Sequence, residues 1–303
     1  MNANYTTLAQ DGKKSRRPAA WMKRQPLAAY FLLAFVGTWV TIVPLLLSQR
    51  GFCLLVLPDP LLLLVFFLAT YTGPFAAALV VTRVTTSKAG LRQLLRSIVQ
   101  WRVGLQWYLL VLLGYPLLFA AGISVVAGGA IWTELGRQWP LFFSVYLPNI
   151  LVGLLLPSLG EETGWRGFAL PRLQRQYGPL LGSLVLGSLH GLWHTPAYFV
   201  RGMIVTDGFD GTVFVANTLA IIAVTFIWTW LVNHAQGSVL MAIFIHATSN
   251  AAGAYVQQLA PGPGSPWFTF VLASIVALTL IVLTHGRLGY QPEQAPLLAS
   301  ESA

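Results

Sequence analysis

Long stretches without a charged side chain divide this sequence and predict where it crosses a membrane. No lysine, arginine, aspartate or glutamate lies between Arg24 and Arg50, and comparable gaps recur along the chain. Each gap reaches the roughly 20 residues that a spanning helix needs. Helix-breaking sequences at 233–238 and 261–266 divide the last apolar stretch. We therefore predict eight transmembrane helices, near residues 27–48, 61–82, 105–127, 139–160, 178–199, 212–232, 238–258 and 266–284.

The composition supports a membrane protein. Of the 303 residues, 56% are hydrophobic and only 9% are charged, whereas a soluble domain carries about 25% charged residues. We expect an all-α polytopic membrane helix bundle, with a single membrane-embedded domain over residues 27–285. Residues 1–26 are predicted to form a disordered basic cytoplasmic arm, and residues 286–303 a disordered tail.

The distribution of basic residues predicts the orientation. With the N-terminus inside and eight crossings, 15 of the 18 lysines and arginines fall on the inner side, and only Arg50, Arg137 and Arg201 fall outside. Positive charge of this kind marks cytoplasmic connections, so both termini are expected in the cytoplasm of a cell-membrane protein. The basic residues lie in short clusters between apolar runs, so the net charge of +9 indicates contact with the lipid bilayer and no nucleic acid. Nothing in the sequence indicates an oligomeric state.

Glutamate and histidine inside apolar spans are costly and are therefore candidates for function. The first group is the run 161–166, with the sequence Glu-Glu-Thr-Gly-Trp-Arg, at the end of the fourth predicted span. On a helix, Glu162 and Arg166 are four residues apart and can pair. Glu161, about 100° around the same helix, then remains free to face a cavity.

A second group lies inside the fifth predicted span. His190 and His194 are four residues apart and share one helix face. Gly187 and Gly191 form a pair of small residues that allows another helix to approach closely. These residues predict a polar lining at a helix–helix contact.

The third group is His246 and Asn250, which share a face of the seventh predicted span. A carboxylate with a neighbouring imidazole can hold and deprotonate a water molecule. A second imidazole with an amide can donate to the oxyanion that forms when this water attacks a carbonyl. Two histidines and a glutamate could instead bind Zn²⁺ and leave an open position for water. Both schemes predict hydrolysis of a peptide or amide bond.

At these residues the chain resembles the CAAX protease and bacteriocin-processing (CPBP) family of intramembrane peptidases, which includes the Rce1-type prenyl-protein endopeptidases. Residues 161–166 match the family motif Glu-Glu-x-x-x-Arg, and His246 and Asn250 match His-x-x-x-Asn. His194 matches the histidine of Phe-x-x-x-His, but His190 stands where the family has phenylalanine or, in related sequences, tryptophan. The resemblance covers residues 140–255, about the C-terminal half of the chain.

The resemblance implies catalytic roles for four residues. Glu161 would activate water with His194, while His246 and Asn250 would stabilise the oxyanion. The supporting residues would be Glu162, Arg166 and His190. No cofactor is expected, because asparagine beside histidine is a better oxyanion donor than a metal ligand. The alternative is Zn²⁺ bound by Glu161, His194 and His246.

The expected substrate is a membrane-associated protein or peptide. Glu161 is predicted near the inner interface, whereas His194 lies roughly 24 Å into the fifth span at 1.5 Å per residue. For the two to share a water molecule, we predict a water-filled cavity that opens to the cytoplasm. Two other functions fit parts of the pattern: a proton-coupled transporter, and a membrane binder or immunity protein without catalysis.

Overall fold

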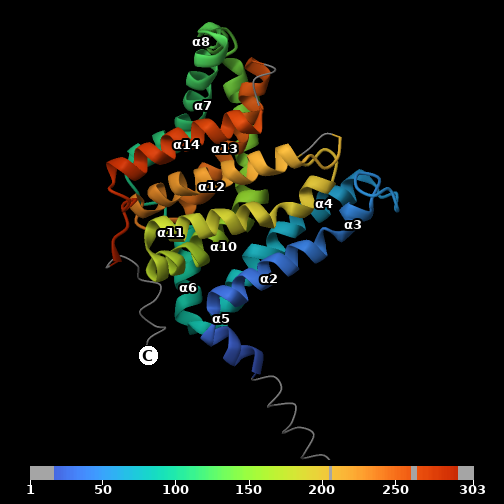
Figure 1. Ribbon diagram of the computed structural model, residues 1–303, viewed down its shortest axis with the longest axis vertical. Helices are drawn as coiled ribbons and strands as arrows, with labels where there is room; N and C mark the ends of the chain where they lie inside the picture. The colour runs from blue at the N-terminus through green and yellow to red at the C-terminus, as the bar shows by residue number, and fades with distance from the viewer. Residues whose placement is uncertain (1–16, 205–206, 261–264, 293–303) are drawn as a thin grey trace, which may run out of the picture.

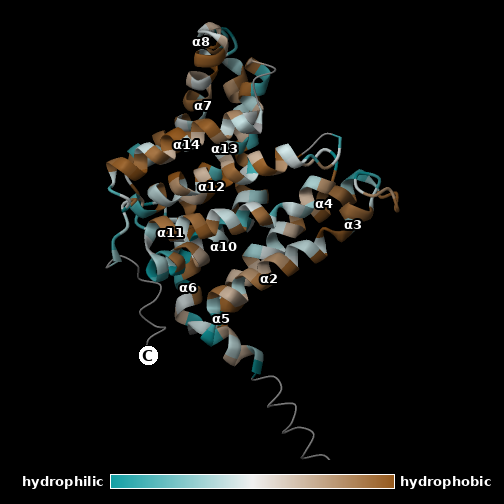
Figure 2. Cartoon of the chain, viewed as in Figure 1, coloured by the Kyte–Doolittle hydropathy of each residue, from teal (hydrophilic) through white to brown (hydrophobic). Residues whose placement is uncertain are grey.

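The described chain consists of helices joined by short connections. A computed structural model describes residues 17–204, 207–260 and 265–292, and this part of the chain contains no β-sheet (Figure 1). Hydrophobic residues cover most of each long helix, and hydrophilic ones gather at loops and helix ends (Figure 2). The predicted all-α membrane bundle is confirmed.

The helices of the N-terminal half form the first three predicted spans and two short connecting helices. They are α2 (Pro26–Thr41), α3 (Val43–Leu47), α4 (Asp59–Thr70), η1 (Tyr71–Phe75), α5 (Ala76–Thr85), α6 (Ser87–Ile98), α7 (Leu105–Ala127) and α8 (Ala130–Arg137). Proline at the start of α2, α3 and α4 is favourable because the first helical N–H has no partner within the helix.

The C-terminal half carries the remaining helices. They are η2 (Phe142–Tyr146), α9 (Leu147–Gly153), η3 (Leu154–Ser158), α10 (Leu159–Gly164), η4 (Trp165–Ala169), α11 (Leu170–Trp193), η5 (Thr195–Phe199), α12 (Gly211–His234), α13 (Val239–Leu259) and α14 (Pro266–Leu283). The segments η2, η3 and η4 are single π-helical turns within one long helical run.

Every predicted span coincides with helix. Six helical segments of the described chain are long and apolar enough to cross a membrane, and one of them, Phe142–Phe199, has 58 residues and contains both the fourth and the fifth predicted spans. The chain turns inside this segment at Gly178, whose φ of 76° is in the left-handed region that glycine adopts without strain. The eighth predicted span is a shorter apolar helix, Trp267–Leu283. The number of eight crossings therefore stays a prediction.

The predicted end of the fourth span is wrong. It was predicted to end at residue 160, but the helical run continues through α10 and η4 into α11. Glu161 and Arg166 are buried within the bundle and do not lie in a solvated inner connection. A charge gap locates the end of a span only where charged residues face water, whereas these side chains have partners inside the protein. The expected difference in depth between Glu161 and the histidines of the fifth span is thus absent.

Each of the two terminal segments predicted to be disordered contains some ordered residues. Residues 17–24 of the arm are helical. Beyond residue 286, Leu288 is fully buried, and its carbonyl oxygen accepts a hydrogen bond of 2.9 Å from the Asn233 amide. Residues 1–16 and 293–303 lie outside the described residues.

The bundle has two chemically different ends. At one end, which we call the basic end, the connection between α12 and α13 meets the segment between α6 and α7: Ser238 donates a hydrogen bond of 2.7 Å to the Gln100 carbonyl oxygen. Gln174, Asn233 and Leu288 also meet here. At the other end, the opposite end, the segment after η5 meets the loop after α3, and the Arg201 amide donates to the carbonyl oxygen of Arg50. Of the described residues, 17–25 and 284–292 lie toward the basic end (Figure 1).

Candidate active site

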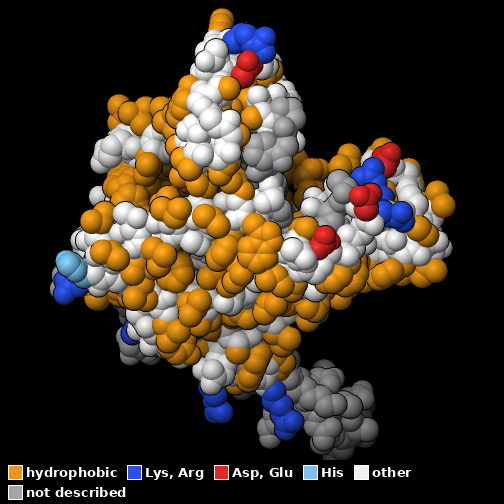
Figure 3. Space-filling view, turned by 45° about the horizontal axis from the view of Figure 1, so that its top comes forward, with side chains coloured by type: hydrophobic (Ala, Val, Ile, Leu, Met, Phe, Trp, Pro, Cys, Tyr) orange, Lys and Arg blue, Asp and Glu red, His pale blue; other side chains and the backbone are white. Residues whose placement is uncertain are grey.

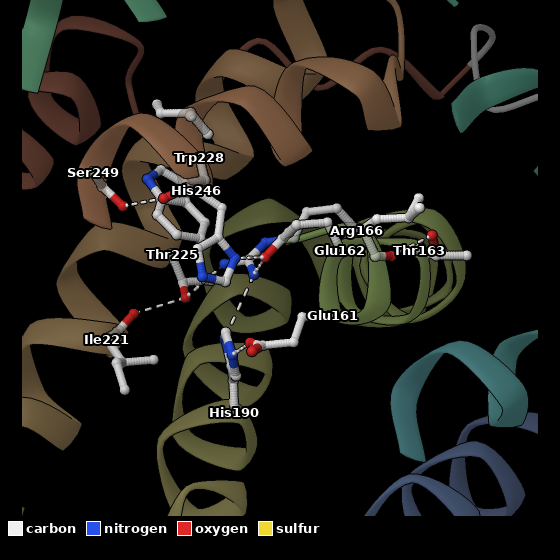
Figure 4. Close-up of polar contacts among 12 residues, drawn as sticks. Glu161, Glu162, Thr163, Arg166, His190, Ile221, Thr225, Trp228, His246 and Ser249 are labelled. Carbon is white, nitrogen blue, oxygen red and sulfur yellow. Dashed lines mark hydrogen bonds and ion pairs between the residues drawn. The ribbon is translucent and has the colours of Figure 1, made fainter. Parts of the chain in front are cut away.

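Glu161 and Glu162 are consecutive residues of α10, and their side chains point toward different partners. The π-turns η3 and η4 flank α10, and Pro157, which has no backbone N–H, lies inside η3. Turns of this kind commonly occur at functional sites. Glu161 points toward the His190 ring, whereas Glu162 points toward Arg166 (Figure 4).

Arg166 lies at the centre of a buried polar network. It donates through Nη1 to Glu162 Oε1 at 3.0 Å and through Nη2 to Thr225 Oγ1 at 3.2 Å. Its guanidinium carbon lies 4.7 Å from the ring centroid of Trp228, a cation–π distance. The predicted pair of Glu162 and Arg166 is thus present, and both side chains are fully buried.

His190 contacts Glu161 directly, with 3.0 Å between Nε2 and Oε2. On its other side, His190 Nδ1 lies 3.5 Å from Arg166 Nη1. A guanidinium can only donate, so we assign Nδ1 as the acceptor and place the proton on Nε2, which donates to the Glu161 carboxylate. His190, expected as a supporting residue, is therefore the hydrogen-bond partner of Glu161.

His194 lies one turn further on and faces the same space. Its Nδ1 lies 3.0 Å from the carbonyl oxygen of His190. Because a carbonyl only accepts, Nδ1 carries the proton, and in the neutral ring Nε2 remains available. A nitrogen of His194 lies within 4.8 Å of both the Glu161 carboxylate and the His190 ring. His194 is thus close enough to share a water molecule with Glu161.

Helix α13 supplies the other two candidate residues of the site, His246 and Asn250. His246 Nδ1 lies 2.9 Å from Glu162 Oε1, the same oxygen that accepts from Arg166. A ring nitrogen of His246 is also within 4.8 Å of the Glu161 carboxylate. Asn250, one turn along α13, lines the same cavity and is exposed.

Close contact between α11 and α12 holds these groups at short range. A Cβ atom placed on Gly187 would lie 2.8 Å from Cα of Ile222, and one placed on Gly191 would lie 2.8 Å from the methyl group of Thr218. Only glycine allows this approach. The predicted role of the two glycines in helix packing is confirmed.

A cavity of about 530 Å³ connects the site residues. Of the residues singled out from the sequence, five line it: Glu161, His190, His194, His246 and Asn250. Glu162 and Arg166 do not line the cavity. They lie behind its wall, where Glu162 contacts His246. The remaining walls are mostly apolar, with Phe66 from α4 and Phe119 from α7 among them.

The cavity lies toward the opposite end of the bundle. Its lining includes Met203 and Ile204, which follow η5 at that end, and Thr269 near the start of α14. The predicted opening of the cavity to the cytoplasm stays a prediction.

Three further residues of the site were not identified from the sequence. Trp228 packs its ring 5.1 Å from that of His246 and donates through Nε1 to the Tyr115 hydroxyl at 2.8 Å. Trp165 lies 4.9 Å from the His190 ring. Thr225 accepts from Arg166 and donates to the carbonyl oxygen of Ile221. A threonine and a tryptophan within one apolar helix are common enough to carry no signal on their own.

Among the described residues, two sets of side chains lie close enough to share a metal ion: Glu161 with His190 and His194, and Glu161 with Glu162 and His246. Neither is the set of Glu161, His194 and His246 expected for zinc. In the first set the metal would take His190 Nε2, which places the remaining proton on Nδ1. That proton would face the Arg166 guanidinium at 3.5 Å, so two donors would oppose one another. The arrangement around His190 does not fit a zinc ligand.

Comparisons with known proteins agree with the resemblance noted in the sequence. Residues 142–252 match the family described as type II CAAX prenyl endopeptidase, Rce1-like. The CAAX prenyl protease 2 of Methanococcus maripaludis is 30% identical over 130 residues, which are 42% of this chain and 48% of that protein. The chain thus matches about half the length of this curated relative. All seven candidate site residues fall within the family match.

Proposed function

We propose that this chain, Rce1-like over residues 142–252, is an intramembrane endopeptidase that hydrolyses a peptide bond with glutamate-activated water. The observation that carries the proposal is the contact of Glu161 with His190 on the wall of a cavity inside an apolar bundle. A buried carboxylate is costly in a membrane. Here the carboxylate contacts an imidazole at the edge of a space large enough for a peptide segment. This arrangement suits a carboxylate that acts as a general base.

The proposed reaction begins with a water molecule between Glu161 and His194. The carboxylate of Glu161 takes a proton from this water while the water oxygen bonds to the carbonyl carbon of the substrate. The carbonyl oxygen becomes an oxyanion. When the carbon–nitrogen bond breaks, the same proton passes from Glu161 to the leaving amine, so the base ends the cycle deprotonated.

His246 and Asn250 supply the oxyanion donors in this scheme. Glu162 accepts from Nδ1 of His246, and a carboxylate in this position stabilises an imidazolium whose Nε2–H points away from Glu162. The network contains two buried carboxylates and one guanidinium, so it lacks one positive charge. A proton on His246 makes the network neutral. The Asn250 amide adds a donor that does not titrate. Removing one such donor typically reduces kcat about 10²–10³-fold.

We propose that catalysis needs no metal. The donor arrangement around His190 disfavours the set that contains it, and in the set of Glu161, Glu162 and His246 the Oε1 atom of Glu162 already accepts from Arg166 and lies 2.9 Å from His246 Nδ1. The proposed substrate is a membrane-associated protein or peptide with apolar side chains near the cleaved bond. Apolar cavity walls, including Phe66 and Phe119, support this class. The relative from Methanococcus maripaludis is named CAAX prenyl protease 2, and the site residues of this chain do not themselves identify a prenyl group.

Cleavage of a library of fluorogenic, membrane-anchored peptides by purified protein in nanodiscs tests the proposal. Glu161→Gln should lose at least about 10²-fold in kcat, and the wild type should keep its activity in a chelator. Glu134→Gln is the matched control, because Glu134 is a carboxylate that pairs with Arg137 and does not line the cavity. Equal turnover by Glu161→Gln and wild type would refute the assignment of the base. Loss of activity in chelator, restored by Zn²⁺, would refute the metal-free mechanism.

A further inference from the structure

A second, smaller cavity lies at the basic end of the bundle. Its walls come from α6, the start of α11, the connection between α12 and α13, and the C-terminal segment near Tyr290. The cavity measures about 160 Å³ and shares no lining residue with the cavity at Glu161. Pockets for larger organic ligands measure about 300–1,000 Å³, so this one has room for a small group only. We call it the basic pocket.

The charge of the basic pocket is positive. Arg96 and Arg166 line it, and none of the carboxylates that the structure describes does so. Exposed arginines are also present on the elements that form its walls or directly beside them: Arg92, Arg102, Arg175 and Arg287. In Figure 3 the lower edge of the molecule shows blue side chains, whereas red ones appear only on the upper and right-hand projections. The pocket and its surroundings therefore attract an anion.

Both lining arginines have donors to spare. Arg96 is exposed on α6, and within the described residues no hydrogen bond or ion pair engages its guanidinium. Arg166 uses Nη1 and Nη2 to bind Glu162 and Thr225. Its Nε atom is buried and has no hydrogen-bond partner among the described residues. A buried donor without an acceptor is unfavourable, and an oxygen atom bound in the adjoining pocket would supply one.

The start of α13 adds further donors to the basic pocket. Gly237 and Val239 line the pocket, and α13 begins at Val239. The Ser238 side chain accepts from the amide of Met241, so the amides of the first two helical residues have no partner within the helix. A helix N-terminus carries partial positive charge and commonly binds phosphate. Together with two guanidinium groups, this arrangement suits a phosphate oxygen better than a neutral ligand.

Apolar and aromatic side chains beside the basic pocket indicate its level in the membrane. Leu95, Val99 and Trp101 are exposed next to the lining residues Arg96 and Gln100. Tryptophan is enriched where the hydrocarbon core meets the lipid headgroups, and an amphipathic helix with basic residues lies in that interface. Helix α6 has this pattern. The pocket therefore lies at the level of lipid phosphates and is also within reach of small anions in solution.

We propose that the basic pocket binds a phosphate group, carried by an anionic lipid headgroup or by a small soluble ester. Arg96 and the start of α13 bind the phosphate oxygens, and Arg166 forms part of the wall. Because Arg166 also donates to Glu162, a bound phosphate stabilises the guanidinium that holds the network behind the candidate active site. The binding site does not depend on the proposed peptidase activity.

Thermal unfolding of the purified full chain in detergent tests the proposal. Inorganic phosphate, glycerol phosphate and dioctanoyl phosphatidylglycerol are titrated separately at constant ionic strength, with sodium chloride as the reference. A ligand that binds only the folded protein raises its melting temperature in a saturable way. An apparent Kd for phosphatidylglycerol that is about tenfold or more below that of glycerol phosphate assigns the site to a lipid headgroup. A Kd for glycerol phosphate that is equal or lower assigns it to a soluble ester.

Three variants locate the binding in the pocket. Arg96→Gln should raise the Kd of the tightest compound about tenfold or more, because it removes a charge-assisted hydrogen bond. Gln93→Glu, which keeps the shape of a lining side chain and adds a negative charge, should do the same without unfolding the protein. Arg92→Gln is the matched control, because Arg92 is exposed on the same helix and does not line the pocket. It should change the Kd by less than about twofold, since its charge is screened by solvent.

Two results would overturn the proposal. One is the lack of saturable stabilisation of the wild type by all three compounds. The other is an equal loss of binding in Arg92→Gln and Arg96→Gln, which would indicate diffuse attraction by the basic surface in place of a site. Neither result depends on cleavage of a peptide, so an inactive protein would leave the test unchanged.

Discussion

Replacement of Arg166 by methionine should destabilise the protein strongly, because it leaves a buried carboxylate without its main partner. Arg166 is 1% exposed, donates to Glu162 and Thr225, and lies over the Trp228 ring. Methionine fills a similar volume, so the loss is mainly electrostatic. Removing one partner of a buried ion pair costs about 3–5 kcal/mol. His246 remains bonded to Glu162 and can carry a compensating proton, which favours the lower part of that range.

Thermal unfolding in detergent measures this effect, with the fluorescence of the 11 tryptophans as the signal. At about 2–4 °C per kcal/mol, the melting temperature should fall by roughly 10 °C. The matched control is Arg137→Met, whose arginine is 2.7 Å from Glu134 in an exposed pair and whose loss should cost less than about 1 kcal/mol.

The double variant Glu162→Gln with Arg166→Met separates lost charge pairing from lost packing. Because no unpaired charge remains, it should recover at least half of the stability that Arg166→Met alone loses. Its peptidase activity should stay low, since His246 no longer has its carboxylate. A melting temperature for Arg166→Met that equals that of Arg137→Met, or a double variant that is less stable than both single variants, would show that this network does not stabilise the bundle.

Three smaller changes test other parts of the structure. Gly191→Leu should lower stability by about 1–3 kcal/mol in thermal unfolding, because its Cβ would lie 2.8 Å from the Thr218 methyl group; an unchanged melting temperature would contradict the close helix contact. Asn250→Ala should reduce kcat about 10²-fold with little change in KM, and a change in KM alone would instead indicate substrate binding. Asp210→Ala should cost about 1 kcal/mol, because the Asp210 carboxylate accepts from the amides of Thr212 and Val213 at the start of α12; Asp210→Asn should restore most of the loss.

The sequence by itself determined the features that depend on distance along one helix. Apolar stretches located the long helices, because a helix in lipid must satisfy its own backbone. Four-residue spacing was enough to predict that Glu162 pairs with Arg166. The same spacing placed His246 and Asn250 on one face of α13. These relations need no knowledge of how the helices are arranged.

Only the tertiary structure decided the relations between helices. The partner of Glu161 is His190, and Thr225 and Trp228 hold Arg166. Which residues meet depends on the depth and rotation of three separate helices, and a small rotation exchanges one histidine for another. The end of the bundle toward which the cavity lies was likewise hidden from the sequence, because the charges along the chain do not show between which helix ends a cavity forms.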